Sequence, residues 1–254
     1  MHAPFLLLLS LFACNLAPKP ADDTAASDDS DSTGSHDLTI KDVRAGGAVD
    51  GDSITLPHVI VTSPVTRDSE GFFIQDPDGG PRSGLYVWYQ SGMDPYVVAE
   101  GDEISVTGTI SEYYEWTELV LSGLDSIQNV GTGTVPDPID LGDGSGVNLD
   151  DYESTLVTIT DQTVESVNTY NTGLLSSGIS LDDGFLFLDF DCGGHYDSLT
   201  GIIFYQYEEY SLNPRSEADL GNYSAGEGVT STVADIQQGN GCGTVTLNHL
   251  VATT

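Results

Sequence analysis

Basic residues are nearly absent from this sequence. Its 254 residues include only 6 Lys and Arg against 40 Asp and Glu, so the formal net charge is −34 at pH 7. Nucleic-acid affinity rests largely on Lys and Arg that displace counterions from phosphates. Direct nucleic-acid binding is therefore not expected unless divalent cations bridge the two surfaces. A surface of this charge instead favours solubility and attracts cations.

Recognisable catalytic motifs are absent as well. The three cysteines lack the CxxC spacing of a zinc site, and the five histidines are scattered along the chain. The sequence contains no nucleophile elbow and no phosphate-binding loop. We therefore predict that the chain is not an enzyme and holds no cofactor.

No apolar run is long enough to span a bilayer as a mature helix. One short run, Phe5 to Phe12, ends in Leu11-Phe12-Ala13-Cys14 and resembles the lipobox of bacterial lipoproteins. The resemblance implies that residues 1–13 are a signal peptide and that Cys14 carries the several acyl chains needed for stable anchoring. An ordinary signal peptide with an incidental cysteine is the alternative. By the same resemblance, Asn15 after the cysteine implies a lipid-anchored protein of the bacterial cell envelope, at the outer membrane.

Residues 14–37 have the composition of a linker. Ala, Pro, Ser, Thr and Asp dominate this stretch, and it has no apolar periodicity. Such a segment buries too little apolar surface to offset the entropy of ordering. We predict a disordered acidic linker that extends by self-repulsion.

An internal repeat indicates the domain organisation. The sequence Thr-Gly-Thr-Ile at residues 107–110 recurs as Thr-Gly-Ile-Ile at residues 200–203, 93 positions later. Each copy is followed by an aromatic turn. Residues 55–62 resemble residues 246–253, an offset of 191 that is close to twice 93. The predicted units are module 1 at 38–131, module 2 at 148–222, and the start of a truncated third module or a C-terminal strand at 229–254.

Short alternating segments predict an all-β fold. They are rich in β-branched and aromatic residues, which favour strands, and no helix is expected beyond one turn near 216–220. Five strands with a longer connection between the third and fourth fit tandem small OB-type Greek-key barrels, although the composition also permits a sandwich. The expected strands of the first module are 54–63, 72–75, 85–90, 103–112 and 116–130.

Several motifs resemble one family. Residues 71–79, 84–87 and 101–110 look like the OB-fold modules of secreted bacterial nucleases, which precede a catalytic domain of the endonuclease/exonuclease/phosphatase type. Residues 200–202 and 213–220 are similar to the end of a companion module. The resemblance implies a non-catalytic binding or tethering role in a secreted nuclease-like system. The alternatives are the N-terminal part of an extracellular nuclease whose catalytic domain is missing, and a structural cation-binding envelope lipoprotein.

Aromatic side chains of module 1 are the predicted ligand-binding residues. Alternation along the strands places several rings on one face, and the loop after the fourth strand adds others. They would offer stacking platforms for a glycan or protein partner. The alternative is that these rings cover the mouth of the barrel or pack against the second module. The candidates are Phe73, Tyr86, Trp88, Tyr113, Tyr114 and Trp116.

Two further features carry weaker predictions. Asp76 and Asp78, in an Asp-Pro-Asp-Gly-Gly cluster, are oxygen ligands of the kind that calcium prefers, but an ordinary turn explains the same residues. Cys192 and Cys242 remain after Cys14 is lipidated. An even pair in an oxidising compartment favours a disulfide, with two free buried thiols as the alternative.

Overall fold

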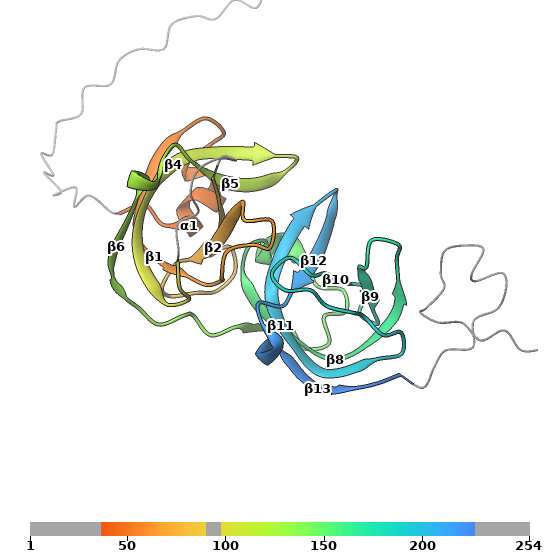
Figure 1. The fold of residues 1–254 in the computed structure, drawn as a ribbon. Helices are drawn as coiled ribbons and strands as arrows, with labels where there is room; N and C mark the ends of the chain where they lie inside the picture. The colour runs from red at the N-terminus through yellow and green to blue at the C-terminus, as the bar shows by residue number, and fades with distance from the viewer. Residues whose placement is uncertain (1–36, 90–97, 227–254) are drawn as a thin grey trace, which may run out of the picture. The chain divides into compact units, whose positions relative to one another are not determined.

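The described part of the chain is mostly β. The structure is a computed structural model that describes residues 37–89 and 98–226. These residues form two sheets, connected along the chain by residues 133–138, within one compact unit (Figure 1). The predicted all-β class is confirmed.

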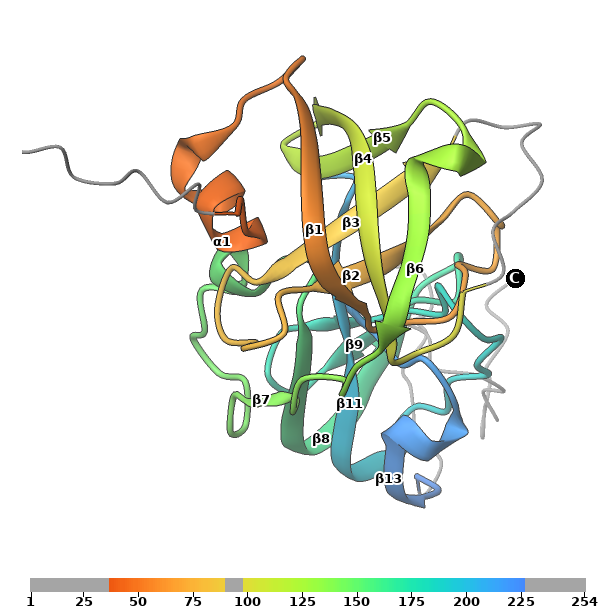
Figure 2. The ribbon, with the colours of Figure 1, turned by 90° about the vertical axis from the view of Figure 1, so that its left-hand side faces the viewer.

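The first sheet closes into a five-stranded barrel. Its strands follow the order β1-β2-β3-β5-β4, and β4 pairs back with β1. The β3–β5 pair is parallel, whereas the other pairs in the ring are antiparallel. A sixth strand, β6, extends the sheet along β4, so that β1, β4 and β6 lie side by side in Figure 2. The strands are β1 (Ser53–Val61), β2 (Gly71–Gln75), β3 (Gly84–Tyr89), β4 (Asp102–Tyr113), β5 (Trp116–Leu121) and β6 (Ile127–Thr132).

The second sheet repeats these pairings. Its order is β13-β11-β12-β10-β9-β8-β7, and β11 also pairs with β8. The ring β8-β9-β10-β12-β11 contains one parallel pair, β10–β12, which corresponds to β3–β5 of the first sheet. The strands are β7 (Ile139–Asp140), β8 (Leu156–Val167), β9 (Gly173–Leu175), β10 (Ser180–Leu181), β11 (His195–Gln206), β12 (Glu209–Asn213) and β13 (Leu220–Ser224).

Local details recur at matching positions. The hydroxyls of Thr55 and Thr107 lie 2.8 Å apart across β1 and β4. Those of Thr158 and Thr200 lie 2.7 Å apart across β8 and β11. The β4–β5 and β11–β12 hairpins each have a turn of two residues with positive φ, which the right-handed twist of a hairpin favours. The turn pairs are Tyr114-Glu115, with φ of 49° and 71°, and Tyr207-Glu208, with φ of 55° and 65°.

One predicted strand is divided in the structure. The segment 116–130 forms β5 and β6, separated by a 3₁₀ turn, because the two strands pair with opposite sides of β4. The other predicted strands of the first module agree with β1 to β4 to within about two residues at each end.

Short helical turns accompany the strands. Thr39 and Asp42 form a reciprocal capping box at the start of the first turn, and Ile40 is buried in the core of the first barrel. The sequence indicates no helix here, because a turn this short has no apolar periodicity. The turns are α1 (Ile40–Asp42), the π-turn η1 (Val43–Gly47), and the 3₁₀ turns η2 (Leu124–Ser126), η3 (Leu149–Tyr152) and η4 (Glu217–Asp219).

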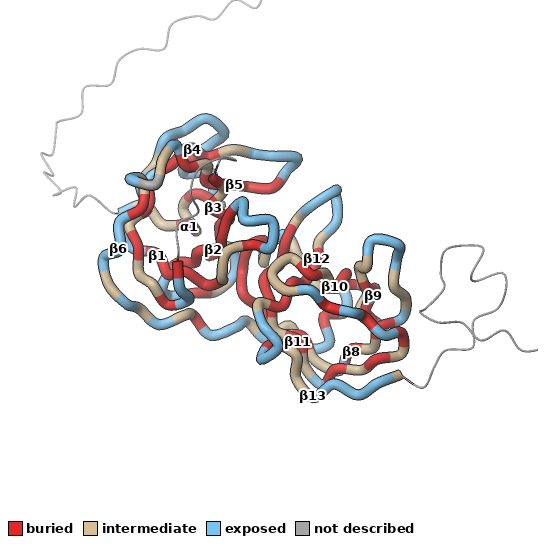
Figure 3. The backbone as a smooth tube through the Cα atoms, in the orientation of Figure 1, coloured by how far each residue is buried: buried red, intermediate tan, exposed pale blue. Residues whose placement is uncertain are grey.

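Buried side chains form three clusters. One fills the first barrel and another lies against the second sheet. The third lies where the two sheets meet, and we name it the contact cluster. Figure 3 shows that both sheets contain stretches of buried backbone. Its buried members are Phe73, Tyr86, Trp116, Leu156, Ile202 and Phe204.

Candidate binding pocket

Three of the predicted ligand-binding rings lie in the contact cluster. Phe73, Tyr86 and Trp116 are all buried. The rings of Tyr86 and Trp116 stack with centroids 4.6 Å apart at an angle of 11°. Phe73 stacks on Phe204 of the second sheet, also at 4.6 Å. These rings therefore pack against the second sheet, which is the alternative that the sequence left open.

The strand register explains why these rings share a face. Phe73 pairs with Tyr86 across β2 and β3, and Phe72 and Ile74 point to the barrel core instead. The outer face of β2 would be exposed in an isolated barrel, but every residue of this strand is buried. The second sheet supplies the covering surface, which the sequence of β2 does not show.

The two sheets also share polar contacts. The side chain of Gln75 is buried; its amide donates to Ser83 Oγ (2.9 Å), and its Oε1 accepts the N–H of Leu156 (2.9 Å). Trp116 Nε1 donates to Ser154 Oγ at 3.1 Å. A Cβ atom on Gly84 would lie 2.1 Å from the carbonyl oxygen of Ser154, so the backbones approach as closely as glycine permits.

The remaining predicted rings are not in this cluster's interior. Trp88 is half-buried and packs against its edge. Tyr113 and Tyr114 lie at the exposed tip of the β4–β5 hairpin, with ring centroids 4.8 Å apart. The six candidates therefore do not form one open aromatic face.

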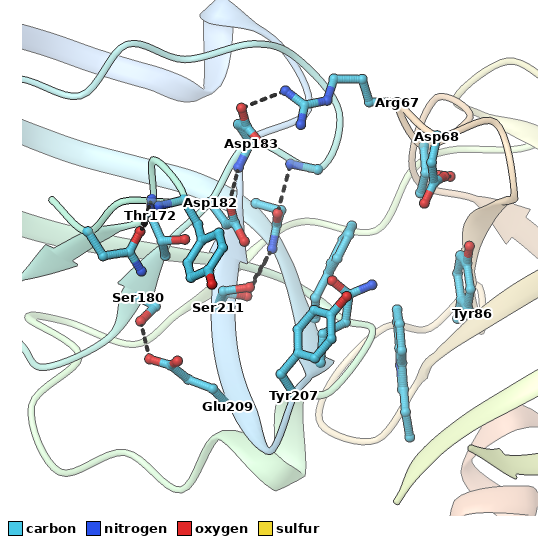
Figure 4. Close-up of a pocket in the computed structure, with 18 residues that line it drawn as sticks. Arg67, Asp68, Tyr86, Thr172, Ser180, Asp182, Asp183, Tyr207, Glu209 and Ser211 are labelled. Atoms are coloured by element: carbon cyan, nitrogen blue, oxygen red, sulfur yellow. Dashed lines mark hydrogen bonds and ion pairs between the residues drawn. The ribbon is translucent and has the colours of Figure 1, made fainter. Parts of the chain in front are cut away.

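A pocket of about 810 Å³ lies beside the contact cluster (Figure 4). Both sheets contribute to it: Tyr86 on β3 and Trp116 on β5 come from the first, and β10, β11 and β12 from the second. Three loops, around Arg67, Asn168 and Asp183, and the β11–β12 turn complete the lining. This volume lies within the usual range of small-molecule sites, roughly 300–1,000 Å³.

Hydrogen bonds hold the polar wall of the pocket in place. The buried amide of Asn213 accepts the N–H of Gly184 (3.0 Å) and donates to Ser211 Oγ (2.9 Å). Ser180 Oγ donates to Glu209 Oε1 at 2.5 Å, as Figure 4 shows. These bonds within the protein position the polar side chains of the pocket wall.

The charge of the pocket is mostly negative. Among the described residues that line the pocket, Arg67 is the one cation, and its Nη1 donates to Asp183 Oδ2 at 2.5 Å. Asp68, Asp182 and Glu209 add three more carboxylates. Burial raises the pKa of Asp182, although the hydrogen bond from the N–H of Asp183 lowers it.

Two tyrosine rings stand at the pocket with their faces open to solvent. Tyr207 is 98% exposed and Tyr170 is 86% exposed. Tyr207 occupies the β11–β12 turn, at the position that Tyr114 holds in the first hairpin. Asn168 Oδ1 accepts the N–H groups of Tyr170 and Thr172, both at 2.9 Å, and so fixes the loop that carries Tyr170.

A group of buried carboxyls lies at another part of the contact between the sheets. Arg44 donates to Glu153 and to Thr117 Oγ1 (2.7 Å), and the Glu153 side chain is 1% exposed. Glu118, on β5, is 7% exposed. No salt bridge to Glu118 is found within the described ranges. Burial raises the pKa of Glu118 to about 7, and the negative charges of Glu112, Glu153 and Glu70 add to this effect.

The predicted calcium residues have protein partners. Both carboxylate oxygens of Asp76 accept helix N-terminal N–H groups, from Ile40 (2.8 Å) and Lys41 (3.0 Å). Asp78 pairs with Lys41 Nζ at 2.8 Å. No group of three or more His, Cys, Asp or Glu with metal-binding geometry is found in residues 37–89 and 98–226. These carboxylates thus anchor the first helical turn to the β2–β3 loop.

The predicted disulfide is only partly described. Cys192 is buried and disulfide-bonded. Cys242 lies outside the described residues, so its pairing with Cys192 stays a prediction. The signal peptide, Cys14 and the segment 229–254 lie outside as well, as does all of the predicted linker except residue 37.

Most of the pocket could not be predicted from the sequence. Arg67, Asp182 and Glu209 come from a loop, a strand end and a hairpin, and none belongs to a catalytic or binding motif. One sequence feature points to this region, the Asp-Asp-Gly cluster at 182–184. Only Tyr86 and Trp116 were predicted as site residues and line the pocket.

Comparison with protein-family models and with curated protein sequences gives no match. The resemblance to nuclease-associated modules therefore stays a prediction, drawn from the motifs alone.

Proposed function

We propose that this chain is a non-catalytic, lipid-anchored binding protein of the bacterial envelope, in which two OB-type modules share one ligand pocket. The pocket beside the contact cluster carries the proposal. It has the volume of a small-molecule site, its lining comes from both sheets, and hydrogen bonds within the protein preset its polar wall.

The strand pairings support OB-type modules in tandem. An OB module is a five-stranded Greek-key barrel. Both rings here contain five strands joined in one cyclic order with a single parallel pair. β4 (Asp102–Tyr113) and β11 (His195–Gln206) begin and end 93 residues apart, at the offset of the sequence repeat.

Binding is tested by blocking the pocket in the full chain. Thr172 lines the pocket, and a Thr172→Trp substitution would fill part of it. Thr109→Trp, at an exposed site on β4 outside the pocket, is the matched control. Arrays of immobilised oligosaccharides and peptides are probed with both variants and with the wild type. We expect at least one ligand to bind the wild type and the control but not the blocked variant. Ligands unaffected by Thr172→Trp, or no bound ligand at all, would refute a binding role for the pocket.

The lipid anchor has its own test. Among the described residues, no helix is long and apolar enough to cross a membrane. The anchor proposed at Cys14 would instead hold the protein through acyl chains. Cys14→Ser should move the protein from the membrane to the soluble fraction and abolish incorporation of labelled fatty acid. Retention of the label by the variant would contradict lipidation at this residue.

The proposed function also includes that the chain does not catalyse a reaction. DNA cleavage assays with Mg²⁺ and with Ca²⁺ check it directly on the purified chain. Cleavage that copurifies with the wild type and is lost in Thr172→Trp would assign a reaction to the pocket and overturn this part of the proposal.

A further inference from the structure

The open tyrosine rings indicate one half of the ligand's chemistry. An exposed aromatic ring offers an apolar face on which another flat apolar surface can stack. Tyr207 and Tyr170 offer two such faces beside a polar wall. The matching ligand has an apolar face and polar groups along its edge.

Hydrogen-bonding groups indicate the other half. An ionised carboxylate accepts about four hydrogen bonds. Within the described residues, one side-chain bond reaches Glu209, from Ser180, and one backbone bond reaches Asp182. Each therefore retains acceptor capacity toward a ligand that donates. Gln206 and Asn168 place side-chain amides in the same lining.

The charges exclude anionic ligands. Four lining carboxylates, Asp68, Asp182, Asp183 and Glu209, face a single cation, and Arg67 is already bonded to Asp183. The whole chain, these residues included, carries a formal net charge of −34. A phosphate or uronate group entering the pocket would meet like charge, with no unpaired cation among the lining residues that the structure describes.

We propose that the pocket binds a short uncharged oligosaccharide, with one sugar ring on Tyr207 and its hydroxyls donating to Glu209 and Asp182. The inference rests on the proposed binding function and adds the ligand class. A sugar ring supplies both a C–H face for the tyrosine and hydroxyls that donate and accept. An organic cation fits the carboxylates but cannot accept the donors of Gln206 and Asn168, so the mixed lining favours the sugar.

The experiment is isothermal titration of the full chain with defined probes. The uncharged probes are maltotetraose, cellotetraose and chitotetraose; tetragalacturonate represents acidic sugars, and spermidine represents organic cations. We expect an uncharged probe to bind, with a Kd that changes less than about twofold between 50 and 500 mM NaCl, because no ion pair forms. Tetragalacturonate and spermidine should not bind the pocket.

Two hairpin variants locate the binding. Tyr207→Ala should weaken binding of the uncharged probe about tenfold, the loss expected when one stacking ring is removed. Tyr114→Ala changes the corresponding turn residue of the first hairpin, which is 75% exposed and outside the pocket. That control should leave the affinity unchanged. Equal losses in both variants would place the sugar elsewhere.

Other outcomes separate the ligand class from the binding function. Salt-sensitive binding of spermidine that Tyr207→Ala weakens would overturn the sugar and leave a binding pocket in place. If a peptide binds and Thr172→Trp blocks that binding, while no uncharged probe binds, the sugar is overturned and the binding pocket remains. If no probe and no array ligand responds to either pocket variant, the ligand class and the proposed function both fall.

Discussion

Glu118 should make this protein less stable at pH 8 than at pH 5. Its carboxyl is buried beside other acidic groups, and burial raises its pKa to about 7 from an ordinary 4.5. The folded state therefore holds the proton more tightly than the unfolded state does. The stabilisation is fully present below pH 4.5, declines as the pH rises, and is lost above about pH 7.

The size of the effect follows from the pKa difference. A change of one in pKa corresponds to about 1.4 kcal/mol. Keeping Glu118 ionised in the folded state thus costs on the order of 3 kcal/mol, of which about 2–3 kcal/mol appears between pH 5 and pH 8. In Glu118→Gln the side chain stays neutral at every pH and nearly the same in shape. This variant should match the wild type near pH 5 and exceed its free energy of unfolding at pH 8.

Urea denaturation at half-unit steps from pH 5 to pH 8 measures the difference. Glu208→Gln, at the exposed tip of the second hairpin, is the control, because it removes the same charge without removing a buried group. The control should parallel the wild type across the whole range. If Glu118→Gln also parallels the wild type, the carboxyl is not desolvated in the folded protein and the reasoning is refuted.

Three further predictions concern the contact between the two sheets. Arg44→Ala would leave Glu153 buried without its cationic partner, so the free energy of unfolding should fall by about 3–5 kcal/mol in urea denaturation; a loss below about 1 kcal/mol would mean that water takes the place of the arginine. Gly84→Ala would force a Cβ into a backbone carbonyl and should lower the melting temperature, whereas Gly131→Ala, where the nearest atom is 3.7 Å away, should have little effect; equal melting temperatures would contradict the close approach. Phe73→Ala removes a fully buried ring and should cost about 3–5 kcal/mol, while an unchanged stability would show that the sheets do not pack on this residue.

The strands of the first module could be predicted because their causes are local. Alternating β-branched residues predicted the bounds of β1 and β4, because side chains on a strand alternate between its two faces. The 93-residue offset indicated matching elements because equal turns and strands need similar residues. The division of 116–130 into β5 and β6 was missed, because both halves have strand composition and only their pairing with β4 separates them.

The sequence by itself determined that Phe73 and Tyr86 share the outer face of their strands, apart from the barrel core. Only the tertiary structure decided what covers that face. Phe204 lies more than a hundred residues away in the chain, yet its ring stacks on Phe73 at 4.6 Å. The pocket depends on the same long-range contact, because its lining joins Tyr86 and Trp116 to Glu209 and Asp182. The periodicity of a segment indicates only which of its residues share a face. A site between two segments depends on how their surfaces pack together.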